Sequence, residues 1–173
     1  MLLNTDIFYF LLGFLIGSIP TGYLLTQSIG DIRKFGSGNI GATNVLRYGG
    51  KFLGLLTLLI DAAKGFITIV YFHTYIQGDV SDHTYTIMMG TATILGHIFS
   101  PWLSFKGGKG VATFLGILFA LSYGLAALFI FTWLTVSLIF KYSSLSSIFS
   151  SLTVFIIALI TEKVTFAINP NTY

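Results

Sequence analysis

The chain has 173 residues, of which 54% are hydrophobic and only 9% are charged. Soluble proteins average about 25% charged residues, so this composition excludes an ordinary soluble domain and predicts a polytopic membrane protein. The net charge of +3 is spread over the chain without a dense basic run, which argues against a nucleic-acid partner. The sequence has no cysteine, so it excludes disulfides, thiolate nucleophiles and cysteine metal sites.

Apolar runs predict an all-α membrane helix bundle of six spans, in a single domain over residues 1–173. The expected spans cover about 7–25, 52–72, 85–99, two segments within 111–140, and 145–160. Pro20 lies near the end of the first span and should kink it. The first run lacks a basic start and a cleavage site, so we expect it to be retained rather than removed as a signal peptide.

The apolar run 111–140 is ambiguous. One helix of that length would reach about 45 Å, against a hydrocarbon core of about 30 Å. Two spans hinged near Tyr123-Gly124 would each be about 20 Å, which requires local thinning of the bilayer. Two spans return Lys141 to the side that carries the other loop cations, so the charge distribution favours two.

With six spans, basic and acidic residues separate onto opposite sides of the membrane. By the positive-inside rule the basic side is cytoplasmic, and the N-terminus is outside. The basic side holds Arg33, Lys34, Arg47, Lys51, Lys106, Lys109 and Lys141, and the other side holds Asp6, His73, Asp79, Asp82 and His83.

Two polar, glycine-dense and basic segments interrupt the hydrocarbon, and both fall on the predicted cytoplasmic side. We call residues 35–47 the first glycine loop and residues 105–113 the second glycine loop. Glycine backbone can offer N–H groups as an anion nest, hydroxyl and amide side chains add hydrogen-bond donors, and arginine and lysine supply charge suited to phosphate. The candidate ligand-binding residues are Ser37, Gly38, Asn39, Thr43, Asn44, Arg47, His97, Lys106, Gly107, Gly108 and Lys109.

Each of these residues also has an ordinary structural explanation. Ser37 and Asn39 are common turn formers, Thr43 or Asn44 could cap a helix, and cations often mark the ends of spans. Two such segments on one face nevertheless favour a site for two phosphate groups. Neither segment contains an obvious general base, since the nearest carboxylate is Asp31.

Gly36-x-Gly38-x-x-Gly41 also matches the dinucleotide fingerprint, with Asp61 about 20 residues further on. That fingerprint has meaning only after a strand in a βαβ unit, whereas here it follows a membrane span. The second glycine loop does not fit the phosphate-binding pattern of nucleotide hydrolases. We therefore expect no nucleotide cofactor and no metal ion.

Three ionisable residues lie in or next to spans. Asp61 and Lys64 are three residues apart and share a helix face, so we expect a buried pair that braces the structure. His97 precedes the second glycine loop, and the sequence does not separate a buried helix-end histidine from one that lines the site.

In these segments the chain resembles the bacterial acyl-phosphate:glycerol-3-phosphate acyltransferases, small integral membrane enzymes that make lysophosphatidic acid. The resemblance covers essentially the whole chain in order. It is carried by residues 17–22, 37–47, 61–65, 95–97 and 106–113.

The resemblance implies a seven-helix fold with three cytoplasmic motifs, in a monomer of the bacterial inner membrane. It implies transfer of an acyl group from acyl-phosphate to the 1-hydroxyl of glycerol-3-phosphate, a step of phospholipid biosynthesis that uses no cofactor. It also implies that Ser37 and Arg47 are needed for activity, that Gly107 and Gly108 bind acyl-phosphate, and that Lys106 contacts phosphate.

The family's third motif, a His-x-x-Asn-Ile-x-Arg stretch after a seventh span, has no match in this sequence. We therefore expect a truncated or frame-disrupted copy with little activity. The alternative is a non-catalytic membrane protein that binds or transports phosphate esters. A transporter should carry ionisable groups in several spans, yet only the span at 52–72 clearly does so.

Overall fold

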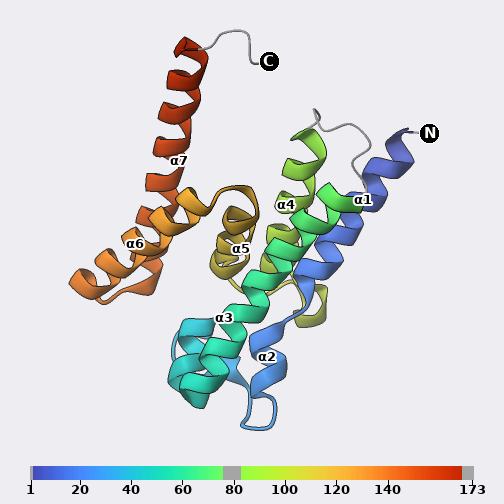
Figure 1. Ribbon diagram of the computed structural model, residues 1–173. Coiled ribbons are helices and arrows are strands. Elements are labelled where there is room, and N and C mark those ends of the chain that lie inside the picture. Colours follow the sequence, from blue (N-terminus) through green and yellow to red (C-terminus); the bar gives the residue numbers. More distant parts are fainter. Residues whose placement is uncertain (1, 76–82, 169–173) are drawn as a thin grey trace. The chain divides into compact units, whose positions relative to one another are not determined.

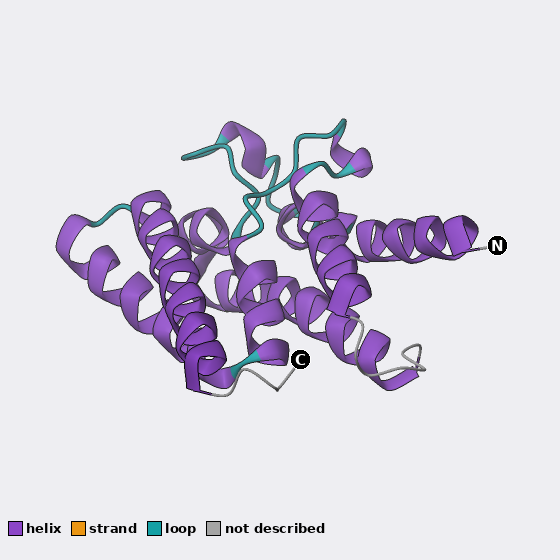
Figure 2. Cartoon of the chain, turned by 90° about the horizontal axis from the view of Figure 1, so that it is seen from above, coloured by secondary structure: helices purple, strands orange, loops and turns teal. Residues whose placement is uncertain are grey.

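The computed structural model describes residues 2–75 and 83–168, and side chains over residues 7–71 and 85–161. Within these ranges all regular structure is helical, which confirms the predicted all-α membrane fold (Figures 1 and 2). The chain divides into two compact units, Met1–Leu121 and Ser122–Tyr173. The two units differ in which residues pack together, which does not show that either folds by itself. The single domain over residues 1–173 therefore stays a prediction.

Over residues 2–75 and 83–121, the first unit contains five α-helices and two short 3-10 helices. In chain order they are α1 (Leu2–Ser18), α2 (Thr21–Thr26), η1 (Ile32–Lys34), α3 (Ala42–Tyr75), α4 (His83–Ile98), η2 (Pro101–Leu103) and α5 (Val111–Leu121).

The predicted first span is broken at Ile19-Pro20, between α1 and α2. Proline has no N–H and cannot continue the hydrogen-bond ladder of the preceding turn, so the kink expected at Pro20 is confirmed. Two residues just before the second glycine loop hold this break in place. Ser100 Oγ donates to the Ser18 carbonyl at 2.6 Å, and Trp102 Nε1 donates to Ser18 Oγ at 2.9 Å.

Helices of the first unit pack in two close pairs that depend on glycine. In the pair α1–α4, a Cβ at Gly17 would overlap the Thr93 carbonyl, and one at Gly96 would overlap that of Phe14. In the pair α3–α5, Gly65 and Gly116 face the backbone of the opposite helix in the same way. Small residues let helix backbones approach closely in a membrane, where packing replaces the hydrophobic effect between helices.

The start of α3 differs from the sequence prediction. Residues 42–49 were expected within a loop, but they form the first turns of α3. Gly50 then interrupts the helix with a φ of 87°, a conformation that glycine adopts readily, and the long apolar part follows. The expected span at 52–72 is therefore the second part of a broken helix.

The second unit is a hairpin of α6 (Tyr123–Phe140) and α7 (Ser143–Ile168). The run 111–140 is thus broken into two helices, and the expectation that both cross the membrane stays a prediction. The break lies at Ser122, whose Oγ accepts the Leu125 N–H at 3.3 Å and caps α6. Lys141, with a φ of 60°, ends α6 in the left-handed conformation, and Trp133 Nε1 donates to Ser147 Oγ across the hairpin at 3.2 Å.

Among the described residues, four segments are long and apolar enough to cross a membrane: Ile7–Thr26, Ala42–Tyr71, Tyr123–Phe140 and Ser143–Thr161. The helix α5, with 11 residues, reaches only about 16 Å. The count of six spans and the outside N-terminus therefore stay predictions. Asp6, His73, Asp79, Asp82 and His83, which were assigned to the outer side, lie outside the described side chains.

Candidate functional site

The first glycine loop is folded around one buried amide side chain, that of Asn44. Its Oδ1 accepts the Ser37 backbone N–H at 3.2 Å, and its Nδ2 donates to the carbonyls of Phe35 at 3.0 Å and Asn39 at 2.9 Å. The side chain is 2% exposed. Asn44 therefore holds the loop closed on itself, and its predicted contact with substrate stays a prediction.

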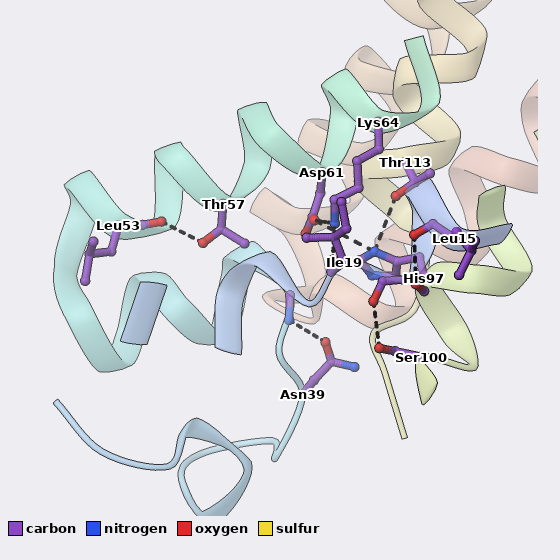
Figure 3. A network of polar contacts seen from close by, with 12 residues as sticks. Leu15, Ile19, Asn39, Leu53, Thr57, Asp61, Lys64, His97, Ser100 and Thr113 are labelled. Atoms are coloured by element: carbon purple, nitrogen blue, oxygen red, sulfur yellow. Dashed lines mark hydrogen bonds and ion pairs between the residues drawn. The ribbon is translucent and has the colours of Figure 1, made fainter. Parts of the chain in front are cut away.

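Glycines allow this closure. Gly36 and Gly38 have φ values of 56° and 70°, and a Cβ at Gly36 would overlap the Asn44 amide. Asn39 Oδ1 accepts the Gly41 N–H at 2.7 Å and supports the turn that leads into α3 (Figure 3). Thr43 is half-buried in the first turn of that helix.

The second glycine loop is fastened to the end of α4. The Gly107 N–H donates to the Ile98 carbonyl at 2.9 Å, and the Gly108 N–H donates to the His97 carbonyl at 3.0 Å. These carbonyls belong to the last turn of a helix, where no partner exists within the helix itself. The expectation that Gly107 and Gly108 offer open N–H groups to an anion is wrong for this conformation, because both groups cap α4.

Shape explains why glycine stands at both positions. A Cβ at Gly107 would overlap the His97 carbonyl, and one at Gly108 would overlap Nε2 of the His97 ring. Before them, Ser104 and Phe105 have φ values of 54° and 61°, which is unusual for residues with a Cβ. The tight turn at Ser104-Phe105 brings Lys106 to the surface while the glycines press against α4.

A small hydrophobic core joins the two loops. Leu103, just before the second glycine loop, is buried together with Ile32, Ile40 and Val45 from η1 and the first glycine loop. Leu103 lies three residues before Lys106, and Val45 lies two residues before Arg47. The prediction that the fold brings the two loops together is therefore confirmed.

Three side chains predicted to act on the substrates, the first two as residues needed for activity and the third as a phosphate contact, lie at the surface. Ser37, Arg47 and Lys106 are all exposed. Within the described side chains, neither Arg47 nor Lys106 forms an ion pair, so both charges are available to a ligand. Lys109 is also exposed, whereas Gly108 is buried.

Behind the loops lies a buried polar cluster made by α3, α4 and α5. Lys64 Nζ donates to Asp61 Oδ1 at 2.6 Å and also to the Ile19 carbonyl at the break between α1 and α2. His97 Nδ1 is 3.8 Å from Asp61 Oδ1 and 3.4 Å from Thr113 Oγ1 (Figure 3). The predicted Asp61–Lys64 pair is confirmed, and His97, 5% exposed, is a buried helix-end histidine.

The comparisons with known proteins agree with this arrangement. The family profile described as "Glycerol-3-phosphate acyltransferase" matches residues 7–170, nearly the whole chain. The chain belongs to this glycerol-3-phosphate acyltransferase family. It is therefore a membrane-embedded acyltransferase, and the resemblance found in the sequence is confirmed.

Individual members are similar over most of their length. The glycerol-3-phosphate acyltransferase of Mesorhizobium japonicum is 49% identical over 138 residues, which are 79% of this chain and 68% of that protein. The one from Ehrlichia canis is 47% identical over 148 residues, 84% of this chain and 75% of that protein. The crystal structure of PlsY (YgiH), an integral membrane glycerol 3-phosphate acyltransferase in its glycerol 3-phosphate form, matches with a TM-score of 0.81 and 36% identity, over 91% of this chain and 78% of that one.

Two parts of the candidate site were missed by the sequence reasoning. One is the hydrophobic core under the loops, whose only signal was the isolated apolar residues Ile32, Ile40 and Leu103 within polar segments. The other is the Ile19 carbonyl, which accepts from Lys64. Pro20 marks this position, because a proline break leaves backbone acceptors that need new donors.

Asp31, the carboxylate nearest in sequence to the first glycine loop, is paired with Arg33. Arg33 Nε and Nη2 donate to its two oxygens at 2.9 Å each, and this side-chain hydrogen bonding holds the pKa of Asp31 below its ordinary value. The guanidinium also lies over the Tyr23 ring, 4.9 Å from its centroid. A carboxylate with a lowered pKa is a weak proton acceptor, so Asp31 is poorly suited to act as a general base.

We expect Asp31→Asn to change kcat/KM by less than about twofold between about pH 6 and pH 8. The depressed pKa keeps Asp31 ionised throughout this window, so its titration falls below it. The pH profile of glycerol-3-phosphate acylation checks this. A lost acidic limb or a drop of about 100-fold, the size typical for a catalytic base, would make Asp31 a catalytic residue.

Proposed function

We propose that this enzyme transfers an acyl group from acyl-phosphate to the 1-hydroxyl of glycerol-3-phosphate, giving lysophosphatidic acid and inorganic phosphate. It does so as a monomer in the bacterial inner membrane, with its N-terminus outside and both glycine loops in the cytoplasm. Family membership supports glycerol-3-phosphate as the acceptor. The acyl-phosphate donor is what the family resemblance implies, and two basic loops suited to phosphate are compatible with it.

The shared hydrophobic core carries this proposal. Leu103 packs with Ile40 and Val45, so the chain segments that carry Lys106 and Arg47 meet at one hydrophobic core. Each glycine loop also leads directly into a helix, the first into α3 at Ala42 and the second into α5 at Val111. Helix N-termini favour negative charge, so both loops suit phosphate groups.

Each loop then takes one phosphate. Arg47, with its planar fork, and the Ser37 hydroxyl bind the phosphate of glycerol-3-phosphate. Lys106 and Lys109 bind the phosphate of the donor as point charges, and the packed backbone of Gly107 and Gly108 holds these lysines at the surface. Holding two phosphorylated reactants side by side replaces a bimolecular encounter with a positioned reaction.

The reaction needs no covalent enzyme intermediate. Acyl-phosphate is a mixed anhydride, so attack of the 1-hydroxyl oxygen on the acyl carbon breaks the bond to a good leaving group. The electron pair of that bond leaves with phosphate, which also takes the hydroxyl proton. Lys106 and Arg47 stabilise the negative charge that develops in the transition state. This route fits a site whose nearest carboxylate is already engaged by Arg33.

We expect acyl-phosphate to be used at least about 100-fold more efficiently than acyl-CoA of the same chain length. A compact pair of phosphate sites fits a small donor, and neither loop resembles a nucleotide-binding segment. The measurement is the rate of lysophosphatidic acid formation by purified protein in detergent. Release of inorganic phosphate that depends on glycerol-3-phosphate is the matching second assay.

Comparable rates with acyl-CoA would contradict the donor assignment. Binding of both phosphate esters without any turnover would instead support the alternative, a non-catalytic phosphate-ester binder.

A further inference from the structure

The pair Asp61–Lys64 is buried to an unusual degree for charged residues. The two side chains are 2% and 5% exposed, and they lie in the apolar part of α3. Charged groups at such depth are costly in a membrane, and replacing a buried pair by apolar residues is often neutral or stabilising. Stability alone therefore does not explain why the chain has this pair. The contacts of the pair with other parts of the chain offer an explanation.

One contact reaches toward the first glycine loop. Lys64 Nζ donates to the Ile19 carbonyl, which stands at the break just before α2. The helix α2 lies directly on the first glycine loop, since a Cβ at Gly22 would overlap the Ile40 carbonyl. Lys64 thus fixes the segment against which the first glycine loop rests.

The other contact reaches toward the second glycine loop. Asp61 Oδ1 faces His97 Nδ1 at 3.8 Å, and Thr113 Oγ1 faces the same nitrogen at 3.4 Å. The His97 carbonyl accepts the Gly108 N–H, and its ring fills the space that a Cβ at Gly108 would need. Figure 3 shows Asp61, Lys64 and Thr113 converging on Ile19 and His97.

We propose that Asp61 and Lys64 are positioning residues that set the two glycine loops at a fixed distance from each other. Lys64 holds the first glycine loop through Ile19 and α2, and Asp61 holds the second through His97 and Gly108. Neither residue touches substrate. This role rests on the proposed function, because the loops need a fixed spacing only if each binds one of two reactants.

The test uses a double variant, Asp61→Leu with Lys64→Met, which removes the pair without leaving an unpaired buried charge. The chain has no cysteine, so Lys34→Cys and Ser104→Cys give two spin-label sites, one beside each glycine loop. Both positions are exposed, and Ser104 directly precedes the second glycine loop. The distance distribution between the labels reports loop spacing without any substrate.

We expect a narrow distribution in the parent protein and a broad or shifted one in the double variant, with thermal stability retained. In the same variant without labels, KM should rise for both substrates, and kcat/KM should fall by about 10-fold to 100-fold, because misplacement by about 1 Å can cost that much. The single variant Lys64→Arg should keep the narrow distance distribution of the parent, since it keeps a cation that can reach the Ile19 carbonyl. Thr57→Val is the matched control and should leave the distance distribution unchanged. Thr57 Oγ1 donates to the Leu53 carbonyl, which lies one turn away on the same helix.

An unchanged distance distribution in a folded double variant overturns the proposal. If the double variant does not fold, Asp61→Asn decides in its place, because it keeps the shape and removes the negative charge that faces His97. An unchanged distribution there overturns the proposal equally. The parent protein could fail to transfer acyl groups while the label distances still change when the Asp61–Lys64 pair is removed. That result would refute the proposed function and leave the positioning role intact.

Discussion

Arg47→Lys should lower kcat/KM for glycerol-3-phosphate acylation by about 100-fold, which corresponds to about 2.7 kcal/mol of transition-state stabilisation. The guanidinium can donate two parallel hydrogen bonds to one phosphate, and an ammonium on a flexible stem cannot reproduce them. Losing one well-placed donor to developing charge typically costs a factor of 100 to 1,000. Arg47 is exposed, so the variant should fold as the parent does.

The matched control is Arg33→Lys, the same substitution in a neighbouring part of the cytoplasmic surface. The Nε–Nη2 edge of the Arg33 guanidinium already forms a two-bond pair with Asp31, so the charge of Arg33 is partnered within the protein. Exposed ion pairs contribute little to stability, and we expect activity within about twofold of the parent. Equal activity losses in both variants, or near-parental turnover in Arg47→Lys, would remove Arg47 from the site.

The arrangement of helices was largely predictable, because each break leaves a local signal. Proline at position 20 lacks the N–H that a continuing helix needs, and the break between α1 and α2 lies there. The length of the run 111–140 exceeds the bilayer, and the chain breaks at Ser122. The first turns of α3 were not foreseen, because the eight residues 42–49 are too few to show an apolar periodicity that distinguishes a helix from a loop.

The residues of the candidate site were predictable from the sequence, but the hydrogen bonds that connect them were not. Composition placed Ser37, Arg47 and Lys106 among the candidate residues, the family resemblance singled them out, and the structure shows all three at the surface. The backbone N–H groups of Gly107 and Gly108 were assigned to an anion, yet they cap the last turn of α4. A glycine pattern shows that backbone must approach something closely, and only the fold shows whether the partner is a ligand or another helix.

The two glycines press against different parts of His97. A methyl group at Gly108 would meet the His97 ring, and one at Gly107 would meet the His97 backbone carbonyl. We expect Gly108→Ala and Gly107→Ala each to lower kcat/KM for acyl-phosphate by about 10-fold to 100-fold, because the displaced loop carries Lys106 and Lys109 away from their positions. KM for the acyl donor should rise more than KM for glycerol-3-phosphate. Equal changes in the two KM values would remove the second glycine loop from the donor site.

A double-mutant cycle with His97→Ala separates the two cases, since neighbouring residues that clash are strongly non-additive. Removing the ring frees the space for a methyl group at Gly108, so Gly108→Ala should cost several-fold less in the His97→Ala background than in the parent. Gly107→Ala should cost the same in both backgrounds, because the carbonyl remains. Gly124→Ala is the neutral control, since its nearest neighbour, Ser122 Oγ, would be 3.7 Å away. Additive effects at Gly108 would mean that the loop is not seated on His97, and that the glycine is required for the ligand instead.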